Sequence, residues 1–256
     1  MKRAFRLALL LAAGGLIAGC ASVPQDPAAR AEFQANHDPF EPLNRKTFAF
    51  NQYVDRLLIK PLATGYRSAL PQVARDGVRH FLDNLSEPLV FANDLLQARF
   101  SSAGTTGCRF VVNSTVGIAG FTDVASRHDL PRQVGDFGQT LWAWGMPEGP
   151  YLILPVFGPS NPRDGIGTGV DMYLDPFRYI ARAQDYGAPV TVGRVVLDGI
   201  DKRSRSLDAL DEMQREAIDY YASFRSLFRQ HRAAELSGKV SPDKPPLPDL
   251  YEDPGR

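Results

Sequence analysis

Apolar residues recur at helical spacing over much of the chain between residues 38 and 236, and this spacing predicts a mostly α-helical protein. Asp38-Pro39 is typical of a helix start, so one helix is expected from residue 39 to about residue 58, ending before Pro61. A second helix is expected to begin at Pro71, and a third to restart at Ser86-Glu87-Pro88. The apolar stripe of the first helix consists of Leu43, Phe50, Val54, Leu57 and Leu58.

The second half of the chain is less uniform. Residues 109–121 mix β-branched, small and polar side chains, so a β segment and a helix both remain possible there. From residue 187 onward the pattern is helical again, and it leads into an amphipathic stretch over 207–231. After the N-terminal leader no segment approaches roughly 18 consecutive apolar residues, so no transmembrane helix is expected. A series of alternating segments of about ten residues is also missing, so we expect no transmembrane barrel.

The N-terminus has the pattern of a secretory signal. Lys2, Arg3 and Arg6 precede an apolar run over residues 7–18, which is too short to span a bilayer. The run ends in Ile17-Ala18-Gly19-Cys20, which resembles the bacterial lipobox, whose cysteine receives a diacylglyceryl thioether. We therefore expect a lipoprotein signal peptide over 1–19 and a lipid anchor on Cys20. The alternative is an ordinary signal peptide with a chance cysteine.

The residues next to Cys20 bear on sorting and on organisation. Ala21-Ser22 follows the cysteine in place of the aspartate that commonly retains such lipoproteins in the inner membrane, which favours the outer membrane. Residues 20–37 are rich in Ala, Gln, Asp and Pro and are expected to form a flexible tether. Residues 237–256 are rich in proline and charge and are expected to form a disordered tail. The folded domain is thus expected over 38–236.

Composition excludes several classes of protein. Lys+Arg and Asp+Glu both number 29, and this balance argues against nucleic-acid binding, which normally shows a basic excess. The two cysteines exclude a disulfide scaffold and a zinc site built from several thiolates. Cys108 lies beside Phe110, Val111 and Val112 and is expected to be a small buried apolar side chain.

No motif for catalysis, metal binding or cofactor binding emerges. The histidines, at positions 37, 80, 128 and 231, lack metal-ligand spacing. Gly158-Pro159-Ser160-Asn161-Pro162 lacks the final glycine of a nucleophile elbow, so a lipid hydrolase is unsupported. Val170 stands where a dinucleotide fingerprint that starts at Gly165 would need its last glycine. We expect a protein that is not an enzyme and has no cofactor.

Two apolar segments raise the question of membrane contact. Leu152–Phe157 and Phe40–Leu58 are apolar enough to lie against lipid, as amphipathic helices do in one leaflet. The same periodicity fits the core of a soluble globule that hangs from its anchor. The pattern alone leaves both interpretations open.

A set of short sequence motifs occurs in a fixed order C-terminal to the lipobox. In this order and spacing they resemble the MlaA (VacJ) family of outer-membrane lipoproteins, strongly over about 38–180 and more weakly beyond. Trp142-Ala143 departs from the family pattern, which usually has a glycine there. The strings are Asp38-Pro39-Phe40-Glu41, Asn44-Arg45, Phe48-Ala49-Phe50-Asn51, Asn84-Leu85-Ser86-Glu87-Pro88, Arg109-Phe110, Asn113-Ser114-Thr115-Val116-Gly117, Phe137-Gly138-Gln139-Thr140-Leu141, Trp144-Gly145, Gly149-Pro150-Tyr151, Leu154-Pro155, Gly158-Pro159-Ser160 and Arg163-Asp164.

The resemblance implies a mostly α-helical, ring-shaped domain whose amphipathic helices lie in the inner leaflet of the outer membrane, on the periplasmic side. Members of the family enclose a polar channel and associate with trimeric porins. They pass mislocalised outer-leaflet phospholipids to a soluble periplasmic carrier, MlaC, and so maintain lipid asymmetry without catalysis. A structural or surface interaction lipoprotein that transports no lipid is the alternative.

The resemblance also suggests which residues form the ring. Apolar candidates that would contact lipid or pack the ring include Phe48 and Phe50, and the segment Phe48–Asn51 matches a place where ring integrity controls lipid leakage. The polar candidates would line the channel or form its ion-paired frame, the alternative being ordinary helix caps and ion pairs. These polar candidates are Asn44, Arg45, Asn51, Arg163, Asp164 and Asp171.

Overall fold

The computed structural model describes Asp26 and residues 38–238. Contacts divide the chain between His37 and Asp38, and the helices and strands described below belong to the C-terminal unit. The predicted signal peptide and lipid anchor, and nearly all of the predicted tether and tail, lie outside the described residues. Within the described ranges no helix is both long and apolar enough to cross a membrane.

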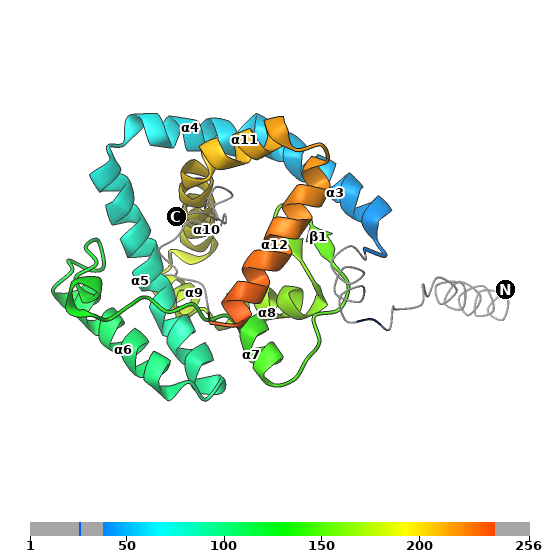
Figure 1. Ribbon diagram of the computed structural model, residues 1–256. Coiled ribbons are helices and arrows are strands. Elements are labelled where there is room, and N and C mark those ends of the chain that lie inside the picture. The colour runs from blue at the N-terminus through cyan, green and yellow to red at the C-terminus, as the bar shows by residue number, and fades with distance from the viewer. Residues whose placement is uncertain (1–25, 27–37, 239–256) are drawn as a thin grey trace, which may run out of the picture. The chain divides into compact units, whose positions relative to one another are not determined.

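Helices dominate the described unit, which confirms the expected fold class (Figure 1). The two short strands pair as an antiparallel hairpin, with Ile153 opposite Pro159. In chain order the elements are α3 (Glu41–Val54), a π-helical turn η1 (Asp55–Ile59), α4 (Lys60–Ala69), α5 (Gln72–Leu96), α6 (Phe100–Thr115), a 3₁₀ turn η2 (Ala125–His128), α7 (Phe137–Ala143), β1 (Leu152–Leu154), β2 (Gly158–Ser160), α8 (Pro162–Leu174), α9 (Pro176–Ala183), α10 (Gly187–Arg205), α11 (Leu207–Glu216) and α12 (Tyr220–Leu236).

The first helical segment is longer than the sequence predicted. It begins at Glu41, two residues later than expected, and continues through Pro61 to Ala69. In a regular α-helix a proline at 61 would clash with the carbonyl of Leu57, four residues earlier. The π-helical turn over Asp55–Ile59 surrounds this carbonyl and widens the helix where the proline ring needs room. Pro61 therefore lies inside a continuous helical path instead of ending it.

A proline also lies inside α5. We predicted that Pro88 would restart a separate helix, but α5 runs unbroken over 25 residues. Helix α6 packs along α5, and hydrogen bonds join the two helices on both sides of the proline, from Asn84 to Ser114 and from Thr106 to Asp94. Tertiary packing thus overrides a local helix-breaking signal.

The structure also defines the two segments, 109–121 and 207–231, whose helices the sequence pattern left undefined. Residues 109–115 complete helix α6, and the chain then turns with Gly120 at a φ of +92°. The amphipathic stretch 207–231 is two helices rather than one, because Ala217 adopts an extended conformation. Asp219 starts the second of them by accepting a hydrogen bond from the backbone N–H of Ala222.

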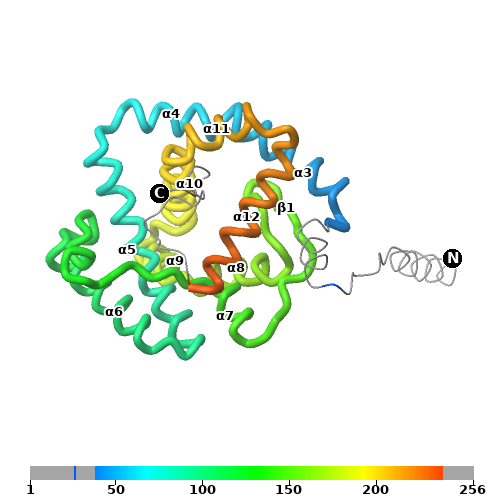
Figure 2. The backbone as a smooth tube through the Cα atoms, viewed as in Figure 1, coloured from blue at the N-terminus to red at the C-terminus, as the bar shows by residue number. Residues whose placement is uncertain are grey.

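The elements of this unit contact one another in a closed circuit. Helix α3 contacts η1 and β1, η1 contacts α4, and α4 contacts α10, which contacts α5. Helix α5 contacts α7, and α7 packs on α8, which directly follows the hairpin in the chain. Figures 1 and 2 show α12, the last helix, extending from the α11 corner toward α7 and α8. The circuit places segments from both halves of the chain around α12.

Gly120 provides a test of this packing. A Cβ at this position would lie 2.5 Å from the Cβ of Asn84 on α5, and its backbone is in the left-handed region. We expect Gly120→Ala to lower the free energy of unfolding by about 2–4 kcal/mol. Gly104, which is helical with open space around it, is the matched control, and Gly104→Ala should be neutral or stabilising by up to about 1 kcal/mol. Chemical denaturation in detergent measures both, and equal effects would contradict the argument.

Candidate functional site

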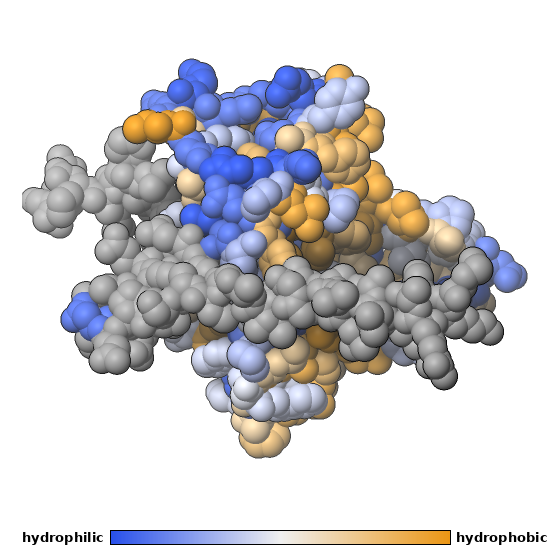
Figure 3. Space-filling view, turned by 90° about the vertical axis from the view of Figure 1, so that its right-hand side faces the viewer, coloured by the Kyte–Doolittle hydropathy of each residue, from blue (hydrophilic) through white to orange (hydrophobic). Residues whose placement is uncertain are grey.

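Burial in the described unit is inverted relative to a water-soluble globule. The largest fully buried side chains are all polar or charged, whereas many large apolar side chains are exposed. Figure 3 shows apolar residues gathered toward the right of one face, beside hydrophilic residues at its upper left. The fully buried polar set is Arg109, Arg163, Asn44, Asn93, Thr106, Thr140, Asp94, Asp201 and Ser204. Since buried polar groups are costly unless they are paired, the internal contacts decide what this arrangement can do.

Two asparagines on α3 hold the edge of the hairpin. The side-chain amide of Asn44 donates to the carbonyl of Tyr151 at 3.0 Å and accepts from the N–H of Ile153 at 2.9 Å. Asn51, two helical turns later, donates to the carbonyl of Leu154 at 3.0 Å and accepts from the N–H of Val156 at 2.8 Å. Both amides therefore act as a neighbouring strand would, and they fix α3 against β1 in one register.

Aromatic rings and ion pairs join the start of α3 to α12. Phe48 is 8% exposed and packs against the rings of Tyr220, Tyr221 and Phe224 on α12. The hydroxyl of Tyr221 donates to the carboxylate of Asp38. Further hydrogen bonds and ion pairs complete the junction. Asn44 and Arg225 also donate to Asp38, and Arg45 pairs with Glu41 and Asp219. The N-terminal and C-terminal helices of the unit are thus connected directly.

Arg232 of α12 is the centre of a second polar cluster. All five of its N–H donors are used, in bonds of 2.7–3.0 Å to carboxylates of Asp136, Asp164 and Glu235. Burial lowers the pKa of Arg232, but the carboxylates outweigh burial and raise it. A Cβ on Gly138 would lie 2.6 Å from the Asp164 carboxylate, so only glycine leaves room for the cluster. Arg232 therefore ties α12 to the starts of α7 and α8.

Arg109 of α6 forms the third cluster. Its guanidinium is 2% exposed and donates to Glu87 of α5 and to Asp123, both at 3.0 Å. It also donates to the hydroxyl of Ser126 and to the carbonyl of Leu130. Burial raises the pKa of Asp123, but hydrogen bonds from Ser126 and Arg109 outweigh burial and lower it to about 2. This cluster holds the segment after α6 in place.

A cavity of about 510 Å³, open to solvent, lies between α11 and α12. Its α12 wall carries Ser223, Ser226, Leu227 and Gln230, which alternate along the helix with the aromatic and arginine residues that pack elsewhere. The α11 side adds a methionine and a carboxylate, so polar and apolar groups share the lining. Such a lining suits an amphipathic molecule better than a small polar substrate.

Seven of the eight residues predicted for the channel or ring wall, all except Phe50, lie in the structural junctions. None of the eight lines the α11–α12 cavity. Asn44, Asn51 and Phe48 hold the hairpin and the α3–α12 junction, while Phe50 is 49% exposed on the outer surface. The others form ion pairs and hydrogen bonds: Arg45 with Glu41 and Asp219, Arg163 with Asp164, Asp164 also with Arg232, and Asp171 with Asn93 and the N–H of Phe137. Their assignment to a channel wall stays a prediction.

The sequence analysis did not identify three residues of these polar clusters, and it predicted the wrong environment for Cys108. Arg109, Asp136 and Arg232 were not predicted as site residues, although Arg109 lies in one of the family motifs and the arginines at 225, 229 and 232 share one helical face. Cys108 is exposed, so the expectation that it is buried is wrong. The buried face of α6 consists of Ala103, Thr106, Arg109 and Asn113, and Cys108 lies off this face. Among the described residues no group of three or more His, Cys, Asp or Glu side chains could hold a metal ion.

Comparison with known proteins gives a consistent result. The family model of the MlaA lipoprotein matches residues 36–235. The chain is 32% identical to the intermembrane phospholipid transport system lipoprotein MlaA of Escherichia coli K12 over 253 residues, 97% of this chain and 96% of that one. It is 35% identical over 202 residues, 78% of each chain, to a Rickettsia felis protein described only as uncharacterized.

The fold also matches a solved structure. That structure is described as the structural basis for maintenance of bacterial outer membrane lipid asymmetry, and it superposes with a TM-score of 0.69 at 30% sequence identity. The match covers 78% of this chain and all of the other chain.

The asparagine pair yields a first prediction for this site. Asn44→Ala should lower the free energy of unfolding by about 2–4 kcal/mol, because it leaves the buried carbonyl of Tyr151 and the N–H of Ile153 unpaired. Thr47→Ala on the same helix removes an exposed hydroxyl that bonds only the Leu43 carbonyl and should change stability by less than about 0.5 kcal/mol. Denaturant titration followed by circular dichroism tests this. A Thr47 effect as large as the Asn44 effect would argue against the stabilising role of the hydrogen bonds from Asn44 to the hairpin.

The Arg109 cluster predicts acid sensitivity. Because the pKa of Asp123 is lowered from 3.8 to about 2, its contribution is present above pH 4 and disappears as the pH falls toward 2. We expect Asp123→Asn to lower stability at pH 7 by about 1 kcal/mol, after allowance for solvent screening, and to weaken the fall in stability between pH 4 and pH 2. Unfolding curves measured across this pH range decide the matter. An unchanged pH profile would show that Asp123 titrates as it does in the unfolded chain.

Proposed function

Because the chain belongs to the MlaA lipoprotein family, we propose that it takes mislocalised phospholipids from the outer leaflet of a bacterial outer membrane and delivers them to a periplasmic carrier, thereby maintaining lipid asymmetry. The observation that carries this proposal is the inverted burial, with polar and charged side chains inside and large apolar side chains outside. The mixed polar and apolar cavity beside α12 gives an amphipathic substrate a path.

The exposed apolar side chains support a position in one leaflet. On α3, η1 and α4 they include Leu43, Phe50, Tyr53, Leu57 and Leu62, which are 46–60% exposed. Soluble proteins rarely present contiguous apolar surface on this scale, whereas a helix that lies in the interface buries its apolar face among acyl chains. Since no described helix can cross the membrane, these helices are proposed to lie within the inner leaflet.

The closed circuit of element contacts supports a ring around a polar channel. A phospholipid head group needs a wet path, while its acyl chains need apolar walls or lipid beside them. We assign the α12 side of this path to Ser223, Ser226, Leu227 and Gln230. Seven of the eight residues predicted from the sequence, all except Phe50, would then form the frame that keeps the ring closed, since their contacts join α3, the hairpin and α12 or link α5, α7 and α8.

The remaining parts of the proposal rest on the sequence and the family resemblance. Acylation of Cys20 would hold the protein on the periplasmic side of the outer membrane. A trimeric porin would be its partner in the membrane, and a soluble carrier resembling MlaC would receive the lipid. The chain would move lipid without breaking a covalent bond, so no catalytic residue is assigned.

Labelling of outer-leaflet phospholipid in intact cells tests the function. A strain that lacks this chain should accumulate aminophospholipid accessible to a membrane-impermeant amine reagent, and the wild-type gene should reverse this accumulation. Cys20→Ala should fail to reverse it, because a single signal-peptide segment cannot replace the acyl anchor. Equal labelling in all strains would favour a structural or surface interaction lipoprotein.

A two-residue deletion of Phe50 and Asn51 tests the ring in the same cells. The deletion removes the hydrogen bonds that Asn51 makes to the hairpin. It also rotates the downstream part of the helix by about 200°, which exchanges the polar and apolar faces of the helix. We expect leakage of phospholipid that dominates over a wild-type copy, because one copy cannot close the passage of another. Phe50→Leu keeps the apolar face and should be silent. Sensitivity to a large hydrophobic antibiotic in a merodiploid strain is the measurement, and a recessive deletion would contradict a gated path beside α3.

A further inference from the structure

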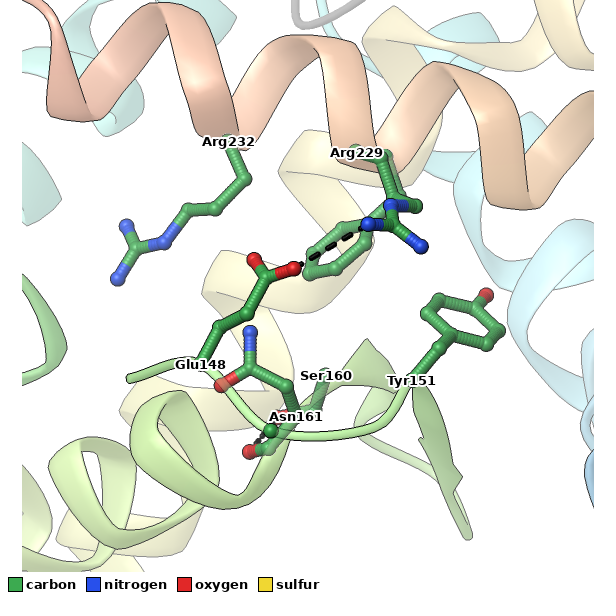
Figure 4. A pocket seen from close by; sticks show the side chains of 8 residues that line it. Glu148, Tyr151, Ser160, Asn161, Arg229 and Arg232 are labelled. Carbon is green, nitrogen blue, oxygen red and sulfur yellow. Dashed lines mark hydrogen bonds and ion pairs between the residues drawn. The ribbon is translucent and has the colours of Figure 1, made fainter. Parts of the chain in front are cut away.

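The interior on the hairpin side of α12 is almost filled. The space shown in Figure 4, between α12, the loop before β1 and the start of α8, measures about 20 Å³, which is room for one water molecule. Arg229 and Glu148 meet beside it at 3.2 Å. Lipid would therefore meet this part of the unit at its outer surface.

One stretch of that outer surface combines a helix end with exposed aromatic side chains. It consists of residues 95–100, where α5 ends and α6 begins, and residues 142–144, where α7 ends; we call it the α5–α7 corner. Helix α5 contacts both α6 and α7, and Figure 1 shows the three helices together in the lower part of the view. The large apolar side chains of the corner are 42–71% exposed, namely Leu95, Leu96, Phe100, Trp142 and Trp144. These two tryptophans are the only ones in the chain.

Charge is nearly absent from the corner. Between Leu95 and Cys108 the one charged residue is Arg99, and its guanidinium pairs at 2.6 Å with Asp94, whose side chain is fully buried. Residues 137–147, which include both tryptophans, carry no charged side chain. Because a surface that faces water normally has charged residues interspersed throughout, this composition suits apolar surroundings.

The backbone at the end of α5 is paired without water. The last four carbonyls of a helix have no partner inside it, and acyl chains offer them none. Here each of the four accepts a hydrogen bond of 2.9–3.1 Å from a donor in the corner. The donors are the backbone N–H groups of Gln97 to Asn93, of Arg99 to Asp94 and of Ala98 to Leu95, and the indole N–H of Trp144 to Leu96.

Helix α11 ends differently. The N–H of Ala217 bonds the carbonyl of Met213, but within residues 38–238 no donor reaches the carbonyls of the next three residues, Gln214, Arg215 and Glu216. These three side chains are polar and exposed, so water can supply the missing hydrogen bonds. Helix α11 thus ends as a helix in water does, whereas α5 ends as a helix in an apolar medium must.

We propose that the α5–α7 corner is a lipid-binding surface that inserts into the inner leaflet, with Trp144 among the acyl chains and Trp142 at the level of the ester carbonyls. The indole N–H of Trp144 is already bonded, so this ring needs no polar partner. The indole N–H of Trp142 has no partner among the residues that the structure describes, and it suits the membrane interface, where tryptophan is enriched.

A docking protein fits the corner less well than lipid does. Protein interfaces share hydrogen bonds between the partners, whereas the corner pairs its helix-end carbonyls internally and exposes mostly apolar side chains. The inference rests on the proposed position in the inner leaflet and not on lipid transport. It gives the chain a membrane contact apart from the expected acyl group on Cys20 and from the apolar face of α3 and α4.

Tryptophan fluorescence reports on this corner alone, since both tryptophans belong to it. The full acylated chain is reconstituted in vesicles of phosphatidylethanolamine and phosphatidylglycerol whose acyl chains carry bromine near the ester end or near the methyl end. Brominated lipid should quench most of the fluorescence, and iodide in the water should quench little. Trp142→Phe, which retains Trp144, should be quenched more by the deep bromine, and Trp144→Phe, which retains Trp142, more by the shallow bromine.

Gln214→Trp in a chain that also carries Trp142→Phe and Trp144→Phe is the matched control, because Gln214 is exposed at the end of α11. Its fluorescence should respond to iodide and not to brominated lipid. Iodide quenching of the wild type equal to that of this control would overturn the proposal. So would a lack of quenching by brominated lipid, or equal depths for the two tryptophans.

A photoreactive benzophenone amino acid in place of Trp142 extends the test to intact cells. Irradiation should produce an adduct with phospholipid, detected by radioactive phosphate. An adduct with a protein alone would overturn the proposal and show that the corner is a docking surface for that protein. Neither experiment measures outer-leaflet labelling, so failure of the lipid-binding corner and failure of the transport function remain distinguishable.

Discussion

Buried charges in residues 38–238 have to be neutralised by other side chains, because a charge removed from water is costly unless it is paired, and here many large apolar residues lie on the surface while polar ones are buried. Guanidinium groups meet this constraint best, since each offers five donors in a rigid fork. Arg232 uses all five on carboxylates, and Arg109 bonds two carboxylates, a hydroxyl and a carbonyl. The folded state therefore depends strongly on the geometry of these hydrogen bonds and ion pairs. Replacing one partner of a pair leaves the other buried without a partner.

The same constraint explains the exceptions to local rules. Pro88 continues inside α5 because α6 packs beside it and Arg109 bonds Glu87 one residue earlier. Gly138 leaves the space that the Arg232 cluster occupies. The two asparagines of α3 supply the hydrogen bonds that a third strand would give to the hairpin. The asparagines pair backbone groups that would otherwise be buried without a partner, and Gly138 leaves room for carboxylates that pair with Arg232.

Helix α12 connects this polar interior to the proposed activity. One of its faces is fixed by aromatic rings and arginines to α3, the hairpin, α7 and α8, whereas Ser223, Ser226 and Gln230 border the α11–α12 cavity. A helix fixed on one side keeps a constant wall on the other, which suits a path for lipid that must not leak.

The sequence by itself determined the helical class and membership of the family, because apolar spacing and an ordered set of motifs are local properties of the chain. Only the tertiary structure decided that α3 continues past Pro61, that α5 contains Pro88 and that Cys108 is exposed. It also decided which carboxylate each arginine meets, for Asp136 and Arg232 are 96 residues apart in the chain. Apolar spacing shows which residues share a helical face, but it cannot show whether that face meets a core, a cavity or lipid, since all three accept the same pattern.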